Sequence, residues 1–211
     1  MKGIKFNDIH SYYDLGLILS KCEIEPASPK TNYIEIPCAD GSIDLSEANG
    51  EIKYNNRNVK FTFSVINENF EEKKMEICNL LNGVKCKITL DKDADFYFLG
   101  RCTVGEHKKE KKVGNITISA VCNPYKYRQN ETIRTYNLDG EEKTITIENG
   151  RKSVVPVIEN EQNLQITFEN KIINLKAGKN MSPNLILKFG MNTIKLLGNG
   201  EVKLTYQEGE L

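Results

Sequence analysis

The stretch Val59-Lys60-Phe61-Thr62-Phe63-Ser64-Val65 alternates apolar and polar side chains along its whole length. Successive side chains of a strand point to opposite faces of a sheet, so this pattern predicts a strand that is buried on one face. The segments 84–90 and 113–122 alternate in the same way. We therefore expect a mainly β protein whose core lies against one face of a sheet.

One segment between these strands, about 69–82, has helical spacing instead. Its apolar residues fall on one side of a helix, namely Phe70, Ile77, Cys78 and Leu81. Asn67 or Asn69 is suited to cap the start of this helix, and Gly83 stands where a helix stop is expected. A helix with a single apolar stripe is predicted to pack across one face or end of the sheet.

The last 84 or so residues read as a succession of short strands separated by turn signals such as Asp139-Gly140 and Asn199-Gly200. We expect the closing strands at 185–189, 192–196 and 202–206. Pro124 is expected to end the preceding strand, because proline cannot continue a central strand. The sequence therefore predicts two domains, 1–127 and 128–211, of which the second is a β-sandwich.

The bulk composition excludes some classes of partner. Lys plus Arg and Asp plus Glu both number 29, so the formal net charge is zero and offers no global attraction to nucleic acid or anionic membrane. No apolar run approaches the ~20 residues of a membrane-spanning helix. The start of the chain lacks the apolar region of a signal peptide, so we expect folding in a reducing cytoplasm.

Motifs for chemistry are missing from the sequence. The six cysteines are widely spaced without a C-x-x-C pair, which favours reduced, buried thiols over a disulfide frame or a metal site: Cys22, Cys38, Cys78, Cys86, Cys102 and Cys122. Only His10 and His107 could serve a catalytic triad, and no G-x-S-x-G, H-E-x-x-H or P-loop occurs. A converging pair of carboxylates, as in glycosidases, stays open. We expect no enzyme, no cofactor and no metal.

A long acidic segment precedes the strand at 59–65. It reads Ile36-Pro37-Cys38-Ala39-Asp40-Gly41-Ser42-Ile43-Asp44-Leu45-Ser46-Glu47-Ala48 and leads to Tyr54-Asn55-Asn56-Arg57. Such connections in compact domains usually have a function, and an extended one can offer unpaired backbone groups to another subunit. The alternative is a loop folded back on its own domain. The candidate interface residues are Asp40, Gly41, Asp44, Glu47, Tyr54 and Arg57.

Three motifs together resemble one family. The acidic segment is similar to the belt of the distal tail proteins (Dit) of bacteriophages and phage-tail-like bacteriocins, which shows Ile-Pro-x-x-Asp-Gly-x-x-Asp followed by Tyr-x-x-Arg. The motif Cys122-Asn123-Pro124-Tyr125-Lys126-Tyr127 resembles the end of that family's N-terminal domain. The run 198–206 resembles its closing Gly-x-Gly-x-Val-x-Val-x-Tyr. Cys38-Ala39 and Phe189 depart from the family pattern, at a common glycine and a common proline.

The resemblance implies an architecture and a role. The N-terminal domain would be a tail-tube-like β-barrel or sandwich that forms a hexameric ring, and the C-terminal domain a galectin-like jelly roll. The protein would be structural, joining the tail tube to the tail-tip and receptor-binding apparatus of a virion tail or tail-like particle assembled in the host cytoplasm. Its partners would be further copies of itself, the tube protein and the tail-tip hub protein, with the tape measure and receptor-binding proteins as additional candidates. Pro124, Tyr125 and Tyr127 would lie at the domain junction.

Other classes remain open from the sequence. A tail tube protein shares the first domain but lacks the second. A carbohydrate-binding module and a hydrolase are further alternatives, although the chain has no tryptophan to serve as a sugar platform. The lysine-rich hairpin tip at 108–112 is expected to be solvated, with docking to an acidic partner as the alternative. It lacks the interleaved aromatic residues that stack nucleic-acid bases.

Overall fold

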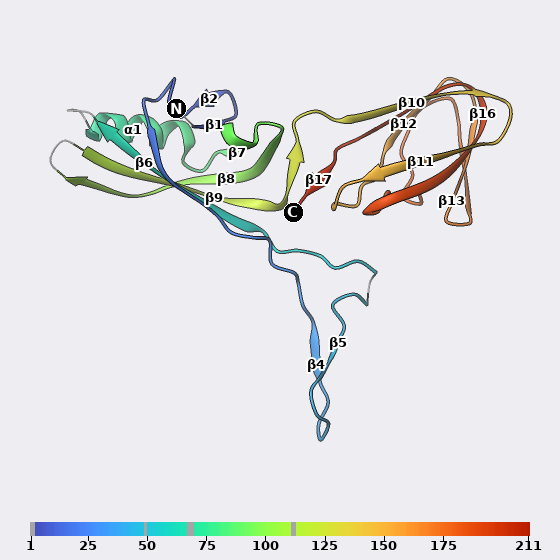
Figure 1. Cartoon of the computed structure of the whole chain (residues 1–211), viewed down its shortest axis with the longest axis horizontal. Coiled ribbons are helices and arrows are strands. Elements are labelled where there is room, and N and C mark those ends of the chain that lie inside the picture. The colour runs from blue at the N-terminus through green and yellow to red at the C-terminus, as the bar shows by residue number, and fades with distance from the viewer. Residues whose placement is uncertain (1–2, 49, 67–69, 111–112) are drawn as a thin grey trace. The chain divides into compact units, whose positions relative to one another are not determined.

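The computed structural model describes residues 3–48, 50–66, 70–110 and 113–211, with only the backbone of residues 66, 106–110 and 113 (Figure 1). The chain divides into two compact units, Met1–Lys126 and Tyr127–Leu211. The predicted helix caps Asn67 and Asn69 and the side chains of the lysine-rich tip at 108–112 lie outside the described residues.

The first unit is built on one antiparallel sheet. Its strands, in spatial order, are β2 (Ile9–His10), β1 (Ile4–Phe6), β7 (Lys85–Leu90), β8 (Phe96–Glu110), β9 (Val113–Arg128), β6 (Arg57–Ile66) and β3 (Ile18–Ile24). The single 3-10 turn of the described residues, η1 (Asp91–Asp93), joins β7 to β8. The mainly β fold class that the alternation predicted is confirmed.

The predicted strand at 59–65 lies at the heart of this unit. In β6, Val59, Phe61 and Phe63 are fully buried, as the alternation requires. They stand directly across from small and branched residues of β9, with Phe61 opposite Ile118. Cross-strand pairs of aromatic and branched side chains stabilise a sheet. The core of the first unit is therefore built on the inner face of the β6–β9 pair.

The α-helix of the first unit, α1 (Phe70–Leu81), lies across this sheet (Figure 1). Phe70, Ile77 and Leu81 are buried in the same core as β6 and β9. Gly83 follows the helix with φ 78°, a left-handed conformation that glycine adopts without strain and that ends a helix. The predicted helix is confirmed. Among the described residues no helix is long and apolar enough to cross a membrane.

The end of β9 differs from the sequence expectation. The strand runs through Pro124 to Arg128 instead of ending before the proline. The reason is that the pairing of β9 with β6 stops at Cys122, opposite Arg57. Pro124 lies beyond the last pair with β6, so its missing N–H interrupts none of those ladder bonds.

The second unit holds two groups of strands that share one long strand, β16 (Gly190–Tyr206). The first half of β16 pairs with β11 (Lys143–Asn149) and β13 (Leu164–Phe168), which continues to β14 (Lys171–Leu175). The second half pairs with β10 (Thr132–Asp139) and β12 (Val157–Asn160), which continues to β15 (Gly178–Asn180). This is the arrangement of a β-sandwich whose sheets share a strand.

Two of the closing strands expected from the sequence form a single continuous strand in the structure. The segments predicted at 192–196 and 202–206 are halves of β16, which passes through Gly198 and Gly200 without a break. The segment predicted as a strand at 185–189 forms only an isolated bridge, between Leu187 and Val154. Leu185 and Leu187 are nevertheless fully buried, so alternation here reports burial rather than strand pairing.

Candidate assembly interface

A hairpin leaves β3 and returns to β6 in the first unit; residues 28–55 are called the arm below (Figure 1). It contains β4 (Tyr33–Glu35) and β5 (Ser42–Asp44), and the chain then returns to the sheet at β6. The two arm strands pair antiparallel, with Glu35 opposite Ser42. Nearer its base, the Lys30 N–H donates to the Lys53 carbonyl at 2.7 Å. The arm is therefore a backbone-paired hairpin and not an unstructured loop.

The arm exposes apolar side chains of the kind that usually pack against another chain. All residues from 28 to 44 are exposed. Large apolar side chains are among them, with Tyr33 57%, Ile34 48% and Ile43 49% exposed. Within the described residues β4 and β5 pair only with each other, so both outer edges present free backbone groups. Exposed apolar side chains beside open strand edges favour contact with another chain.

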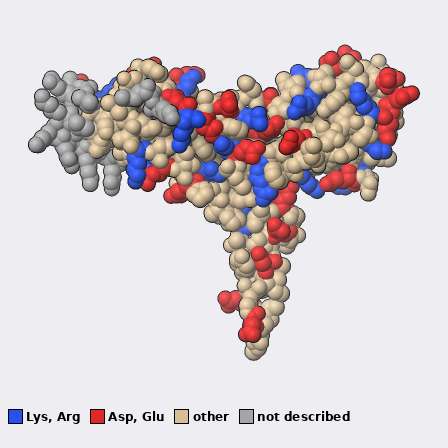
Figure 2. All heavy atoms as spheres, in the orientation of Figure 1, with Lys and Arg blue, Asp and Glu red and all other residues tan. Residues whose placement is uncertain are grey.

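The arm is also acidic. Between residues 28 and 48 it carries the carboxylates of Glu35, Asp40, Asp44 and Glu47 against the single ammonium group of Lys30. Figure 2 shows acidic side chains along its length. The Asp44 carboxylate accepts hydrogen bonds from the Ser46 hydroxyl and from the Ser46 N–H, the latter at 2.8 Å. The hydrogen bond from the Ser46 hydroxyl is the largest cause that lowers the pKa of Asp44.

The tip of the arm is a compact turn. Cys38 adopts φ 65° and Gly41 φ 74°, both in the left-handed region that few residues other than glycine favour. Asp40 lies between the small residues Ala39 and Gly41. No side chain of its immediate neighbours can therefore shield its carboxylate. Asp40 and Gly41 are both exposed, as an interface role requires.

Arg57 has a different environment from the other candidate residues. It begins β6, and only 6% of it is exposed. Its guanidinium carbon lies 5.5 Å from the centroid of the Phe98 ring, in cation–π geometry. Within the described residues its Nε has no hydrogen-bond partner. Burial lowers the pKa of Arg57, and the buried thiol of Cys122 is the neighbouring group that opposes this shift.

The remaining candidates divide between two places. Tyr54 packs edge-on against Tyr125 of β9, with ring centroids 5.9 Å apart, so the structure brings together one interface candidate and one junction candidate. In the second unit, the ammonium group of Lys152 lies 5.0 Å from the centroid of the Tyr127 ring. Glu47 is exposed in the turn after β5.

The structure describes the side chain of His10, and its ring nitrogens serve local hydrogen bonds. His10 Nδ1 accepts the N–H groups of Tyr12 and Tyr13, and Nε2 lies 3.2 Å from Asp91 Oδ1. Both ring nitrogens are thus engaged in holding the start of the chain. The side chain of His107 is outside the described residues. In the described part of the chain, no cluster of three or more His, Cys, Asp or Glu side chains could hold a metal ion.

The cysteines are free thiols, and their burial varies. Cys86, Cys102 and Cys122 are buried, as predicted, in the core of the first unit. Cys22 and Cys78 are half-buried. Cys38 is exposed at the arm tip and departs from the prediction, because the arm has no core to bury it.

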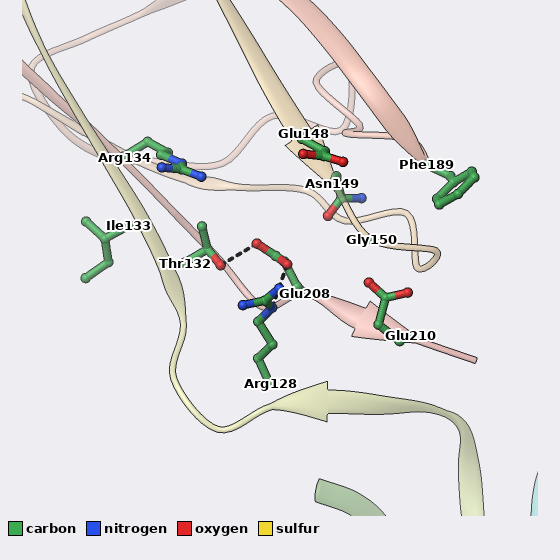
Figure 3. A pocket seen from close by; sticks show the side chains of 10 residues that line it. All are labelled: Arg128, Thr132, Ile133, Arg134, Glu148, Asn149, Gly150, Phe189, Glu208 and Glu210. Atoms are coloured by element: carbon green, nitrogen blue, oxygen red, sulfur yellow. Dashed lines mark hydrogen bonds and ion pairs between the residues drawn. The ribbon is translucent and has the colours of Figure 1, made fainter. Parts of the chain in front are cut away.

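The sequence did not indicate a polar cavity in the second unit, of about 350 Å³ (Figure 3). Glu208 lies at its centre, accepting from Arg128 Nε at 2.9 Å and from the Thr132 hydroxyl at 2.6 Å. The Asn149 amide donates to the carbonyls of Lys152 and Leu187, and its buried Oδ1 has no partner among the described residues. The only sequence signal nearby is the Asn149-Gly150 turn pair.

The fold and the arm define a class of two-unit β protein in which a paired hairpin extends from the first unit. In a search of solved structures the chain matches the crystal structure of Dit (gp 19.1) of phage SPP1, with a TM-score of 0.69 over 98% of this chain and 99% of that chain. That protein is described as a paradigm of the hub adsorption apparatus in phages that infect Gram-positive bacteria. The identity is 12%, so the likeness shows a shared fold.

No protein-family model and no curated protein sequence matches the chain. The resemblance to distal tail proteins that the sequence motifs indicated is confirmed at the level of the fold.

Proposed function

We propose that the chain is a structural subunit of the distal end of a phage tail or tail-like particle. The observation that carries this proposal is the match to SPP1 Dit over nearly the whole of both chains. The match thus takes in both units as well as the arm. A tail tube protein is a poorer candidate, since the residues of the second unit form a set of sheets with their own hydrophobic core.

In this proposal six copies close into a ring that joins the tail tube to the tail-tip hub. Ring closure needs a heterologous contact, in which one patch meets a different patch on the neighbour. The arm supports this role because it offers exposed apolar side chains, open strand edges and acidic groups together. The tube protein, the hub protein and, beyond them, tape measure and receptor-binding proteins are the proposed partners. Assembly would take place in the host cytoplasm, and no catalytic step is involved.

The proposal is tested by the size and shape of the purified full-length protein. Light scattering over a concentration series and negative-stain electron microscopy, each with and without tube protein, should show a six-fold ring with a central hole. A monomer under all these conditions would overturn the proposal.

A matched variant tests whether the arm mediates assembly. Lys30 and Lys53 are hydrogen-bonded across the arm base, so residues 31–52 can be replaced by Asn-Gly, which favours a tight hairpin turn. We expect this arm-shortened chain to fold but to remain monomeric. If it forms the same ring as the natural chain, the arm is not the interface, although the family role would stand.

The cavity of the second unit favours one other function, the binding of a small polar ligand such as a saccharide. Its wall combines guanidinium donors with carboxylate and amide acceptors, which suits a ligand with many hydroxyl groups. A glycan array probed with the full-length chain tests this. Specific binding that Glu208→Gln abolishes would favour it, and no binding to any glycan would count against it.

A further inference from the structure

Arg57 is a buried cation without a compensating anion. Only 6% of Arg57 is exposed, its Nε has no hydrogen-bond partner, and none of the ion pairs found among the described residues includes it. The groups around it are the Phe98 ring and the thiol of Cys122. That thiol is protonated at neutral pH, because burial raises the pKa of Cys122 to about 12. A charged group removed from water is strongly unfavourable unless it is paired and hydrogen-bonded.

The position of Arg57 leaves it within reach of another chain. It is the first residue of β6, and the preceding Asn55 and Asn56 are exposed. Tyr54 and Tyr125, which meet at the arm base, are only half-buried. Arg57 therefore lies at the end of the β6–β9 ladder, where the core stops, with its guanidinium over the Phe98 ring. A carboxylate flanked by apolar groups would complement this surface.

The arm tip has these properties, but it cannot reach the Arg57 of its own chain. Hairpin pairing extends from the Pro29–Tyr54 bridge to the Glu35–Ser42 pair, which holds the tip away from the base. At ~3.3 Å per residue, Asp40 is on the order of 30 Å along the strand from Pro29. A carboxylate at the tip can therefore meet an Arg57 only in a second copy.

Asp40 is the best placed of the arm acids. It is at the tip between two small residues, whereas Glu35 lies within β4 and Asp44 is engaged by Ser46. Glu47 is in the turn beyond β5, further from the tip. Within the described residues, neither the Asp40 nor the Glu47 carboxylate has an ion pair or hydrogen bond, so each is available; the hydrogen bond that Glu47 accepts from the Gly50 N–H is made by its backbone carbonyl. Glu47 therefore serves as a matched control with the same charge.

We propose that Arg57 is the receptor for the Asp40 carboxylate of a second copy, so that the arm tip of one subunit completes the core end of the next. The inference rests on the proposed function, because the ring supplies the second copy. It explains why a cation is kept at a place where an isolated subunit cannot neutralise it. The Phe98 ring lies against the guanidinium group, and the entering carboxylate supplies the hydrogen-bond acceptor that its Nε lacks.

The test compares Arg57→Met, Asp40→Asn and Glu47→Gln with the natural chain, measuring association by sedimentation velocity and folding by thermal denaturation. Loss of one partner of a buried charge pair weakens binding by about 30-fold or more, which we expect for Arg57→Met and Asp40→Asn. Glu47→Gln should stay within about threefold, as peripheral charges contribute little. Arg57→Met should leave the melting temperature unchanged or raise it, because replacing a buried charge by an apolar side chain is often stabilising.

A mixing experiment adds an independent readout. The Arg57→Met chain keeps its arm, and the arm-shortened chain keeps its Arg57, so the two together should form a 1:1 complex that cannot grow into a ring. Assembly of Arg57→Met or Asp40→Asn at natural strength would overturn the inference and leave the proposed function standing. A natural chain that stays monomeric, with no complex on mixing, would overturn both. Because Asp40 is exposed, its variant tests the idea even if Arg57→Met fails to fold.

Discussion

The ring of Tyr54 meets the ring of Tyr125 edge-on, with their centroids 5.9 Å apart and their planes at 76°. Tyr54 lies at the arm base, where it forms an isolated bridge with Pro29, and Tyr125 belongs to β9, so the pair ties the arm base to the sheet. Edge-to-face aromatic pairs contribute about 0.5–1.5 kcal/mol beyond their buried area. This contact makes the arm base part of the folded first unit.

A double-mutant cycle with Tyr54→Leu and Tyr125→Leu should therefore give a coupling energy of about 0.5–1.5 kcal/mol in urea unfolding. Tyr33→Leu, on the exposed part of the arm, is the control and should change the free energy of unfolding by less than about 0.5 kcal/mol. Additive effects of the two leucine substitutions would show that the rings do not interact.

Gly114→Ala should destabilise the first unit. A Cβ atom at Gly114 would lie 2.0 Å from Cε2 of Phe70, the first residue of α1, so the buried Phe70 ring, or the helix that carries it, would have to shift. Overpacking of this kind costs about 1–3 kcal/mol in the free energy of unfolding. Thermal denaturation should show the loss, together with a partial recovery in the Gly114→Ala, Phe70→Leu double variant.

Gly105→Ala is the matched control for this clash. The nearest atom to a Cβ there is the Thr117 carbonyl oxygen at 3.7 Å, which is ordinary contact. If both alanine variants melt at the same temperature as the natural chain, α1 does not pack on β9 as described.

Asn192→Ala should destabilise the second unit by about 2–4 kcal/mol, because buried polar groups left unpaired are costly. Its buried amide donates to the Lys188 carbonyl at 2.8 Å and the Gly190 carbonyl at 3.0 Å, while Oδ1 accepts the Lys188 N–H at 2.8 Å. Asn174→Ala, at an exposed position, should change stability by less than about 0.5 kcal/mol. Urea unfolding measures both, and equal effects would argue against the buried network.

Stability should fall at alkaline pH through Cys122. Burial raises the pKa of this thiol to about 12 from its ordinary value of 9.0, so between these pH values the folded state binds more protons than the unfolded state. The contribution is fully present below about pH 9 and is lost as the pH rises towards 12, with a slope of at most about 1.4 kcal/mol per pH unit. Urea unfolding between pH 8 and 11 should show a shallower decline for Cys122→Ala.

Other groups also titrate in this pH range. The contribution of Cys122 is therefore taken from the difference between variants in the slope of the free energy of unfolding against pH. Cys38→Ala, at the exposed arm tip, should keep the slope of the natural chain. A Cys122→Ala chain whose stability declines as steeply as the natural chain would show that the buried thiol is not responsible.

The spacing of apolar residues predicted the secondary structure correctly where one face of a strand or helix is buried in the core of its unit. The alternation in 59–65 and the apolar stripe of α1 both correspond to buried faces in the first unit. The same signal misled at 185–189, where Leu185 and Leu187 are buried without forming a strand. Side-chain periodicity reports which residues face a core, whereas strand pairing depends on partners far away in the sequence.

The sequence by itself determined the mainly β class, the helix and the acidic arm with its Asp40, since each depends on residues close together in the chain. Only the tertiary structure decided that Pro124 could continue β9, because that depends on where β6 stops pairing. It also decided that Arg57, which the sequence predicted only as a candidate interface residue, is buried against Phe98, with no ion pair found to a described carboxylate. Whether a charged side chain has an oppositely charged partner depends on residues that are close in space but far apart in the chain. The sequence therefore does not show which charged residue lacks such a partner.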